Sequence, residues 1–144
     1  MSSNNIQQGA VNKRIMKGFT NGITRGLILY TLYKQPMHGY DIIKRINEIF
    51  KYSIDNNVIS EVKSSKIYPI LINMEENGII GFESEIRNNK TVKIYEITDK
   101  GKELLMMRKT KSKELLANPH LKEFAEFMLE DFIEEEIKEK SKLN

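Results

Sequence analysis

The sequence has no cysteine and no tryptophan, and only two histidines and three prolines occur among its 144 residues. Without cysteine the chain can form neither a disulfide framework nor a thiolate metal site, which is compatible with a reducing compartment. No apolar run approaches the length of a transmembrane helix, and the polar first residues lack the apolar core of a signal peptide. We therefore expect a cytoplasmic protein with no membrane segment.

Residue clusters typical of catalysis or of cofactor binding are also missing. There is no GxGxxG motif and no other glycine-rich loop that could hold phosphate. We interpret His38 as a turn residue between two helices, because His120 lies far away in sequence and no cysteine could complete a soft metal site. Glu134–Glu136 would project around a helix axis, which indicates a solvated face rather than a cation site. We therefore expect no enzyme activity, no bound metal and no cofactor.

Charge is distributed unevenly along a chain whose net charge is only +3. Residues 1–60 contain eight basic and three acidic side chains, whereas residues 61–144 contain fifteen basic and seventeen acidic side chains. A basic N-terminal part fits a surface that faces a polyanion, although ordinary surface lysines would give the same excess.

Two helices are expected at the start of the folded region. Residues 1–19 are polar and predict a flexible arm, whose basic group Lys13, Arg14 and Lys17 either contacts phosphate or is simply solvated. A largely apolar helix then follows from a cap at Thr20 or Asn21 to Tyr33, and an amphipathic helix runs from about His38 to Phe50. Polar residues 51–63 predict a long loop.

The segment Ser64–Gly78 organises the rest of the chain. Ile67, Ile70, Leu71 and Met74 have the spacing of one buried stripe on a helix, with Ser64 or Ser65 as the N-cap and Gly78 as the stop. The opposite side is small and polar, as suits either an ordinary amphipathic helix or one that enters a DNA major groove. Its members are Ser64, Ser65, Lys66, Pro69 and Asn73.

The pattern changes to alternation after Gly78, and Ile80–Arg87 and Val92–Ile97 predict two strands. Asn88-Asn89 fits a tight hairpin because asparagine tolerates positive φ, and the hairpin tip carries Arg87 and Lys90. Three helices followed by a two-stranded hairpin with a basic tip is the plan of an α+β winged helix-turn-helix domain.

The last part of the chain predicts two further helices. Thr98 caps a helix from Asp99, and Asn118-Pro119 starts another. The basic run 108–113 is either a solvated face or an extension of a DNA-facing surface. A wide apolar stripe on the final helix predicts contact with a second copy of the chain, or else packing on its own domain. The stripe consists of Leu121, Phe124, Ala125, Met128 and Phe132.

Several of these segments resemble the PadR family of transcriptional regulators, in family order over roughly residues 23–105. They are Arg25-Gly26, Met37-His38-Gly39-Tyr40-Asp41-Ile42, Lys66-Ile67-Tyr68-Pro69-Ile70-Leu71, Met74-Glu75-Glu76-Asn77-Gly78-Ile79-Ile80 and Tyr95-Glu96-Ile97-Thr98-Asp99-Lys100-Gly101. The resemblance implies a winged helix, a homodimer built through the C-terminal helix, and binding to a pseudo-palindromic DNA operator, usually as a repressor.

The resemblance also implies roles for single residues. Tyr40 would contact the DNA backbone, Asn88–Lys90 would form the wing tip, and Ser65, Lys66, Tyr68 and Pro69 would lie at the groove. Where the family usually has Gly or Thr before the Ile/Leu-Tyr pair, this chain has Ser65-Lys66, so a base preference cannot be transferred. Some members bind planar drugs between aromatic residues at the dimer centre, often with tryptophan. This chain has no tryptophan, so the resemblance does not transfer drug sensing, and no small-molecule effector is assigned.

We therefore predict a flexible arm over residues 1–19, a winged-helix DNA-binding domain over residues 20–98 and a helical dimerisation region over residues 99–144. The predicted partner is double-stranded operator DNA. The alternative is a winged helix that binds protein and does not touch DNA. The predicted DNA-binding residues are Tyr40, Ser64, Ser65, Lys66, Tyr68, Pro69, Asn73, Arg87, Asn88, Asn89 and Lys90.

Overall fold

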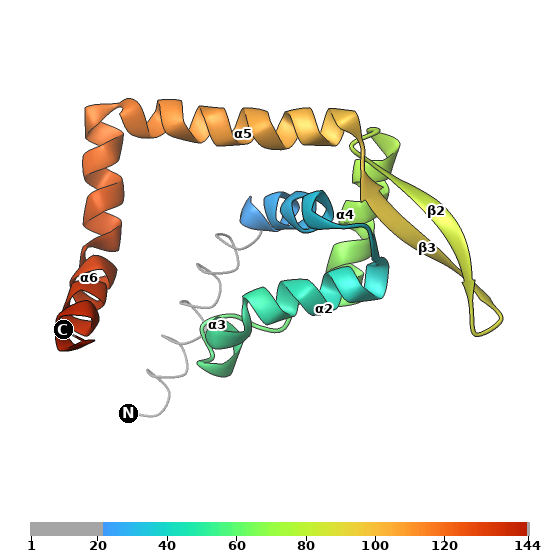
Figure 1. The fold of residues 1–144 in the computed structure, drawn as a ribbon, viewed down its shortest axis with the longest axis horizontal. Helices are drawn as coiled ribbons and strands as arrows, with labels where there is room; N and C mark the ends of the chain where they lie inside the picture. The colour runs from blue at the N-terminus through green and yellow to red at the C-terminus, as the bar shows by residue number, and fades with distance from the viewer. Residues whose placement is uncertain (1–21, 144) are drawn as a thin grey trace, which may run out of the picture. The chain divides into compact units, whose positions relative to one another are not determined.

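The computed structural model describes residues 22–143, without the side chains of residues 129 and 131–137. A helix over residues 22–34 comes first (Figure 1). It is followed by β1 (Met37–His38), α2 (Gly39–Ile49), α3 (Lys51–Asp55), α4 (Ser64–Glu76), β2 (Ile80–Arg87), β3 (Lys90–Ile97), α5 (Asp99–Ala117) and α6 (Pro119–Leu143). The chain forms two compact units, Met1–Leu105 and Met106–Asn144.

The first unit is a winged helix, so the predicted fold class is confirmed. Its helices enclose one apolar core, and its antiparallel sheet has the order β1-β3-β2. The β2–β3 hairpin projects away from the helices (Figure 1). The side chains of the core cluster are Ile28, Leu29, Leu32, Ile42, Ile46, Val62, Ile67, Leu71, Met74, Ile80 and Tyr95.

Helix α4 has the buried stripe that its sequence predicts. Ile67, Leu71 and Met74 are almost completely buried. At its C-terminal end Gly78 has a φ of 69°, and the N–H groups of Gly78 and Ile79 bond the carbonyls of Glu75 and Met74 at 3.0 and 2.9 Å. This is the Schellman arrangement, in which a left-handed residue satisfies the last carbonyls of a helix.

One detail of α4 differs from the prediction. The N-cap is Lys63 rather than Ser64 or Ser65, and no side chain caps this end, because the helix starts one residue earlier than a serine cap requires. Pro69 lies in the second turn of the helix, and it is exposed. The carbonyl group that Pro69 leaves without a helical N–H is that of Ser65, which water can reach.

The predicted loop over residues 51–63 is wrong at its start, because Lys51–Asp55 forms α3. Lys51 and Asp55 pair across one turn, with Nζ 2.9 Å from Oδ2. The two-residue strand β1 was also not predicted, because the connection after the first helix showed only a proline break. Met37 and His38 pair with Tyr95 and Ile94 of β3 and tie that connection to the wing.

The remainder of the residue 51–63 connection is fixed by Asn47 of α2. Its amide donates to the Val62 carbonyl at 2.9 Å and accepts from the Val62 N–H at 2.7 Å. The side chain therefore replaces a backbone partner two residues before α4 begins. Because Val62 is also buried, the start of α4 is held in place although the connection to it is irregular.

The hairpin agrees with the sequence pattern. Ile80 pairs with Ile97 and Arg87 with Lys90, which leaves a two-residue loop. The loop residues Asn88 and Asn89 have φ values of 53° and 62°, as a type I′ turn requires. Only the base of the hairpin is buried.

Thr98 joins the end of α4 to the start of α5. Its hydroxyl accepts from the Gly101 N–H at 3.1 Å, as an N-cap does, and donates to the Gly78 carbonyl at 2.6 Å. Its own N–H bonds the Ile79 carbonyl at 3.1 Å, and Lys100 Nζ donates to the Asn77 carbonyl at 2.8 Å. The predicted Thr98 cap is therefore confirmed.

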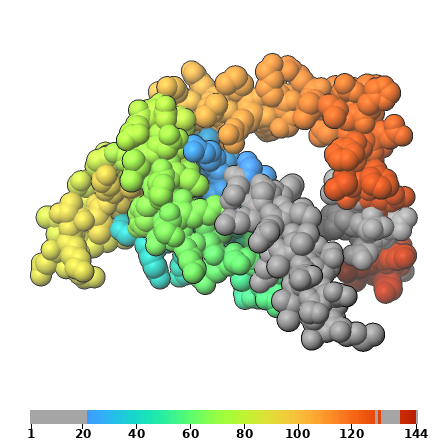
Figure 2. All heavy atoms as spheres, turned by 180° about the vertical axis from the view of Figure 1, so that it is seen from behind, coloured from blue at the N-terminus to red at the C-terminus, as the bar shows by residue number. Residues whose placement is uncertain are grey.

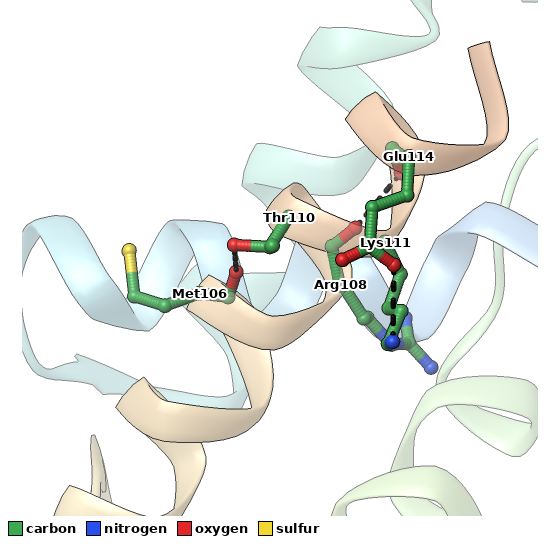
Figure 3. Close-up of polar contacts among 6 residues, drawn as sticks. Met106, Arg108, Thr110, Lys111 and Glu114 are labelled. Carbon is green, nitrogen blue, oxygen red and sulfur yellow. Dashed lines mark hydrogen bonds and ion pairs between the residues drawn. The ribbon is translucent and has the colours of Figure 1, made fainter. Parts of the chain in front are cut away.

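The basic run 108–113 does not end α5. Figure 3 shows that its side chains interact within the helix: Thr110 donates to the Met106 carbonyl at 3.1 Å, and Lys111 Nζ is 3.0 Å from Glu114 Oε2. Asn118 Oδ1 accepts from the N–H of His120 at 3.0 Å, so the predicted restart at Asn118-Pro119 is confirmed.

The expected arm over residues 1–19 and the expected cap at Thr20 or Asn21 lie outside the described residues. Across residues 22–143, no helix has the length and apolar character needed to span a bilayer.

Gly101 provides a test of how closely the start of α5 packs against Ile79 and Ile97. A Cβ there would collide with the backbone carbonyl oxygen of Ile79 and lie 2.7 Å from Ile97 Cγ1. Gly101→Ala should lower the free energy of unfolding by about 2 kcal/mol or more, because backbone cannot move aside cheaply. Gly81→Ala is the control, since its Cβ would meet only Thr98 Cγ2 at 3.9 Å, and it should change stability by less than about 1 kcal/mol. Equal urea denaturation curves for the two variants would contradict this packing.

Candidate nucleic-acid interface

Helix α4 presents a row of small polar side chains on the side away from the core. Ser65, Pro69 and Asn73 are spaced four residues apart, so they lie along one line, and Ser64 adjoins them. All four are exposed, whereas Lys66 at the edge of the row is partly buried. The burial of the opposite stripe therefore fixes which side of α4 faces outward.

Tyr68 holds α4 against the start of α2. A Cβ at Gly39 would lie 2.9 Å from Tyr68 Cε1 and 3.0 Å from its hydroxyl oxygen, so the ring packs where a side chain at residue 39 would be. Tyr68 keeps 38 % of its surface exposed. The Tyr68 ring therefore explains why residue 39 is glycine. One part of the ring packs on α2, and the rest lies on the outer surface.

His38 and Tyr40 belong to the first turn of α2. His38 is the N-cap, and its Nδ1 accepts from the Tyr40 N–H at 3.1 Å. His38 therefore acts as a capping residue in the turn before α2. Tyr40 is 65 % exposed and points away from the core. Its hydroxyl is available to an acceptor outside the domain.

The wing tip is a separate group of polar side chains. Arg87, Asn88, Asn89 and Lys90 are all exposed at the end of the hairpin. Arg87 Nε lies 3.5 Å from Glu85 Oε1, which partly compensates its charge. Lys90 has no ion pair among the described residues, so it is the stronger cation at the tip.

Arg25, on the helix over residues 22–34, was not among the predicted site residues. Its Nη1 donates to Asn73 Oδ1 at 2.8 Å, and both side chains are exposed. The two residues are 48 apart in sequence, so no local pattern could have joined them. The described surface around α4 therefore includes a cation from the helix over residues 22–34.

A second contact links α4 to the wing. Glu75 Oε2 is buried without a hydrogen bond and lies 3.7 Å from Lys93 Nζ, which also sits 4.1 Å from the centre of the Phe82 ring. Phe82 meets Tyr95 edge-on at 6.4 Å. Burial raises the pKa of Tyr95, and the charge of nearby Glu75 raises it further. The base of the wing is therefore tied to α4 by the Lys93–Glu75 pair, while the contact between Phe82 and Tyr95 packs the two strands of the wing against each other.

The apolar stripe of α6 lies in the second unit. Leu121, Phe124 and Met128 are 37, 61 and 64 % exposed, whereas Ala125 is partly buried. The side chain of Phe132 lies outside the described residues. Within the described part of α6, Phe124 and Met128 therefore keep most of their surface in water.

The described residues contain no group of three or more histidine, aspartate or glutamate side chains that could hold a metal ion.

A family model settles the classification of the chain. The model described as the transcriptional regulator PadR-like family matches residues 28–107. This chain belongs to the PadR-like family. Its membership makes it a transcriptional regulator, and the matched region runs from the first described helix into α5.

The chain is similar to several solved structures of transcriptional regulators. A PadR-like transcription factor from Bacteroides fragilis shares 23% identity, with 71% of this chain and 91% of that chain covered and a TM-score of 0.55. A transcriptional regulator from Thermoplasma acidophilum shares 25%, with 81% and 93% covered and a TM-score of 0.53. A Bacillus subtilis PadR in complex with operator DNA shares 33%, with 58% and 44% covered and a TM-score of 0.46. No curated protein matches this PadR-like chain.

The buried phenol of Tyr95 gives a pH-dependent prediction. Because its pKa is raised, the folded state keeps the proton more tightly than the unfolded state, whose tyrosines titrate near 10.0. The stability from this group is complete below that pH and is lost as the pH rises through the raised value. The free energy of unfolding should therefore fall less between neutral and alkaline pH in Tyr95→Phe than in wild type.

Urea denaturation at neutral pH and about one unit above the ordinary tyrosine pKa would measure this difference. Tyr52→Phe is the control, because Tyr52 is 80 % exposed. If Tyr95→Phe loses as much stability at alkaline pH as wild type, the burial of this phenol does not cause the loss of stability at alkaline pH.

Proposed function

We propose that this PadR-like regulator binds double-stranded DNA as a homodimer and represses transcription from a pseudo-palindromic operator. The observation that carries the proposal is the exposed polar row on α4, held outward by the burial of the opposite side in a chain of this family. The proposed regions are an arm over residues 1–19, a DNA-binding domain over residues 20–98 and a dimerisation region over residues 99–144.

In this proposal α4 enters the major groove. Ser64 and Ser65 supply short hydrogen-bonding groups for base edges, Asn73 lies at the far end of the row, and Pro69 leaves the row narrow enough for close approach. Lys66 and Tyr68 flank the row and contact the sugar-phosphate backbone. Contacts of the first kind select a sequence, whereas contacts of the second kind set position and affinity.

The wing and the start of α2 hold the DNA backbone. Lys90 and Arg87 at the hairpin tip neutralise phosphates, and Asn88 and Asn89 donate amide hydrogens beside them. The exposed hydroxyl of Tyr40 donates to a phosphate near the start of α2. The sheet pairing of β1 with β3 supports these two contact regions on one frame.

The apolar stripe of α6 pairs with its copy in a second chain. Exposed Phe124 and Met128 are large enough for such contact to remove substantial apolar surface from water. A two-fold axis would place the two α4 helices about one DNA turn apart, roughly 34 Å, which requires an inverted repeat in the operator. Any effector molecule is outside this proposal, as is any catalytic step.

Lys90 tests the wing contact. Lys90→Ala should weaken binding to all duplexes and lower the slope of log K against log salt by about one, since one phosphate contact is lost. Lys51→Ala is the control, because Asp55 already neutralises Lys51 at 2.9 Å, and it should leave the slope unchanged. Fluorescence anisotropy over a salt series measures both variants.

An unchanged slope in Lys90→Ala would rule out the wing contact. If the wild-type protein fails to bind random-sequence duplex at low salt, the alternative of a protein-binding winged helix replaces the proposal.

The dimer is tested with two matched double variants. Phe124→Gln with Met128→Gln should give monomers at micromolar concentration, because the apolar contact loses the two most exposed of its large members whose side chains are described. Glu123→Gln with Glu126→Gln introduces the same residue on the polar side of α6 and should leave the dimer intact. Sedimentation velocity reports the outcome, and equal masses for the two double variants would contradict an interface on this stripe.

A further inference from the structure

The bond between Arg25 and Asn73 joins two elements at the outer surface of the first unit. Arg25 belongs to the helix over residues 22–34, and Asn73 is the last member of the polar row on α4. Figure 2 shows these two segments, blue and green, side by side. Because both side chains are exposed, the bond contributes little to folding and its main effect is on surface geometry.

The bonded pair offers mostly hydrogen-bond donors to its surroundings. Asn73 Oδ1 uses one of its two lone pairs to accept from Arg25, and the two amide hydrogens of Asn73 remain. A guanidinium has five N–H groups, of which one is used here, and it is always charged. Within residues 22–143, Arg25 forms no ion pair with a carboxylate. The fitting partner is therefore an anion with several acceptor oxygens.

The position of the pair along α4 identifies which anion. Asn73 is eight residues beyond Ser65 on the same line, which corresponds to about 12 Å along the helix axis. The major groove is about 12 Å wide. When the Ser65 end of α4 lies at the base edges, the Asn73 end has reached the edge of the groove, where the phosphates are.

We propose that Arg25, oriented by Asn73, binds a DNA phosphate at the edge of the groove that α4 enters. This inference rests on the proposed DNA-binding function and adds a contact from the first described helix. Asn73 then acts mainly through the guanidinium, and its amide hydrogens bond the same phosphate rather than a base.

The test measures binding of the full-length protein to a short random-sequence duplex over a salt series. Arg25→Gln should lower affinity about tenfold at low salt and reduce the salt slope by about 0.9, because one fewer counterion is released. Asn73→Ala should lower affinity about threefold with no change in slope, because the charge of Arg25 remains while one hydrogen-bond partner is lost. Arg25→Lys should keep the slope, since the charge is conserved.

Arg45→Gln is the matched control, because Arg45 Nε lies 3.7 Å from Glu48 and its charge is already compensated. Its slope should equal that of wild type. If Arg45→Gln lowers the slope as much as Arg25→Gln, the effect is one of net charge and the inference is wrong. A wild-type slope in Arg25→Gln would also overturn the inference. A reduced slope in Arg25→Lys would overturn it as well, and this variant tests the charge even if Arg25→Gln unfolds.

The binding data separate a failure of the proposed function from a failure of this inference. If wild-type protein does not bind duplex at all, the proposed function and this inference both fall. If wild-type protein binds and only the Arg25 variants behave like wild type, the inference alone is overturned.

Discussion

The burial of one side of α4 is the interaction on which the rest of the structure depends. Ile67 and Leu71 are fully buried and Met74 nearly so, and each such side chain contributes about 1.5–3 kcal/mol when it leaves water. Their common direction leaves Ser65, Pro69 and Asn73 on the outside. The polar row is thus a consequence of core packing, and a rotation of α4 about its axis would expose the core and bury polar groups.

Contacts at both ends of α4 convert this burial into a fixed position. Asn47 holds Val62 just before the helix, Tyr68 packs over Gly39, and Thr98 bonds the carbonyl of Gly78 just after it. Lys93 adds a link from Glu75 to the wing. The helix and the hairpin therefore move as parts of one frame, which is what simultaneous contact with a groove and its flanking phosphates requires.

Much of this frame was predictable because its signals are local. The 3.6-residue spacing of Ile67, Leu71 and Met74, the stop at Gly78 and the Asn88-Asn89 turn each depend on a few neighbouring residues. The unpredicted features depend on distant partners. Strand β1 exists because Met37 meets Tyr95, Gly39 is required by Tyr68, and Arg25 meets Asn73 across 48 residues. Helix α3 is short and polar, so its sequence resembles that of a loop. Helix α4 begins one residue before the position that a serine cap would give it. The residues before the helix are held by tertiary contacts, and these contacts set its first residue in place of the two candidate serine caps.

The central claim is that the outer row of α4 and the hairpin tip are the surfaces that meet DNA. Amide chemical-shift changes during titration of isotope-labelled protein with a short duplex test it most directly. The account predicts the largest changes at Ser64, Ser65 and Asn73 and at Asn88–Lys90, with α3 unaffected. Changes absent from α4, or confined to α3 or α6, would contradict it.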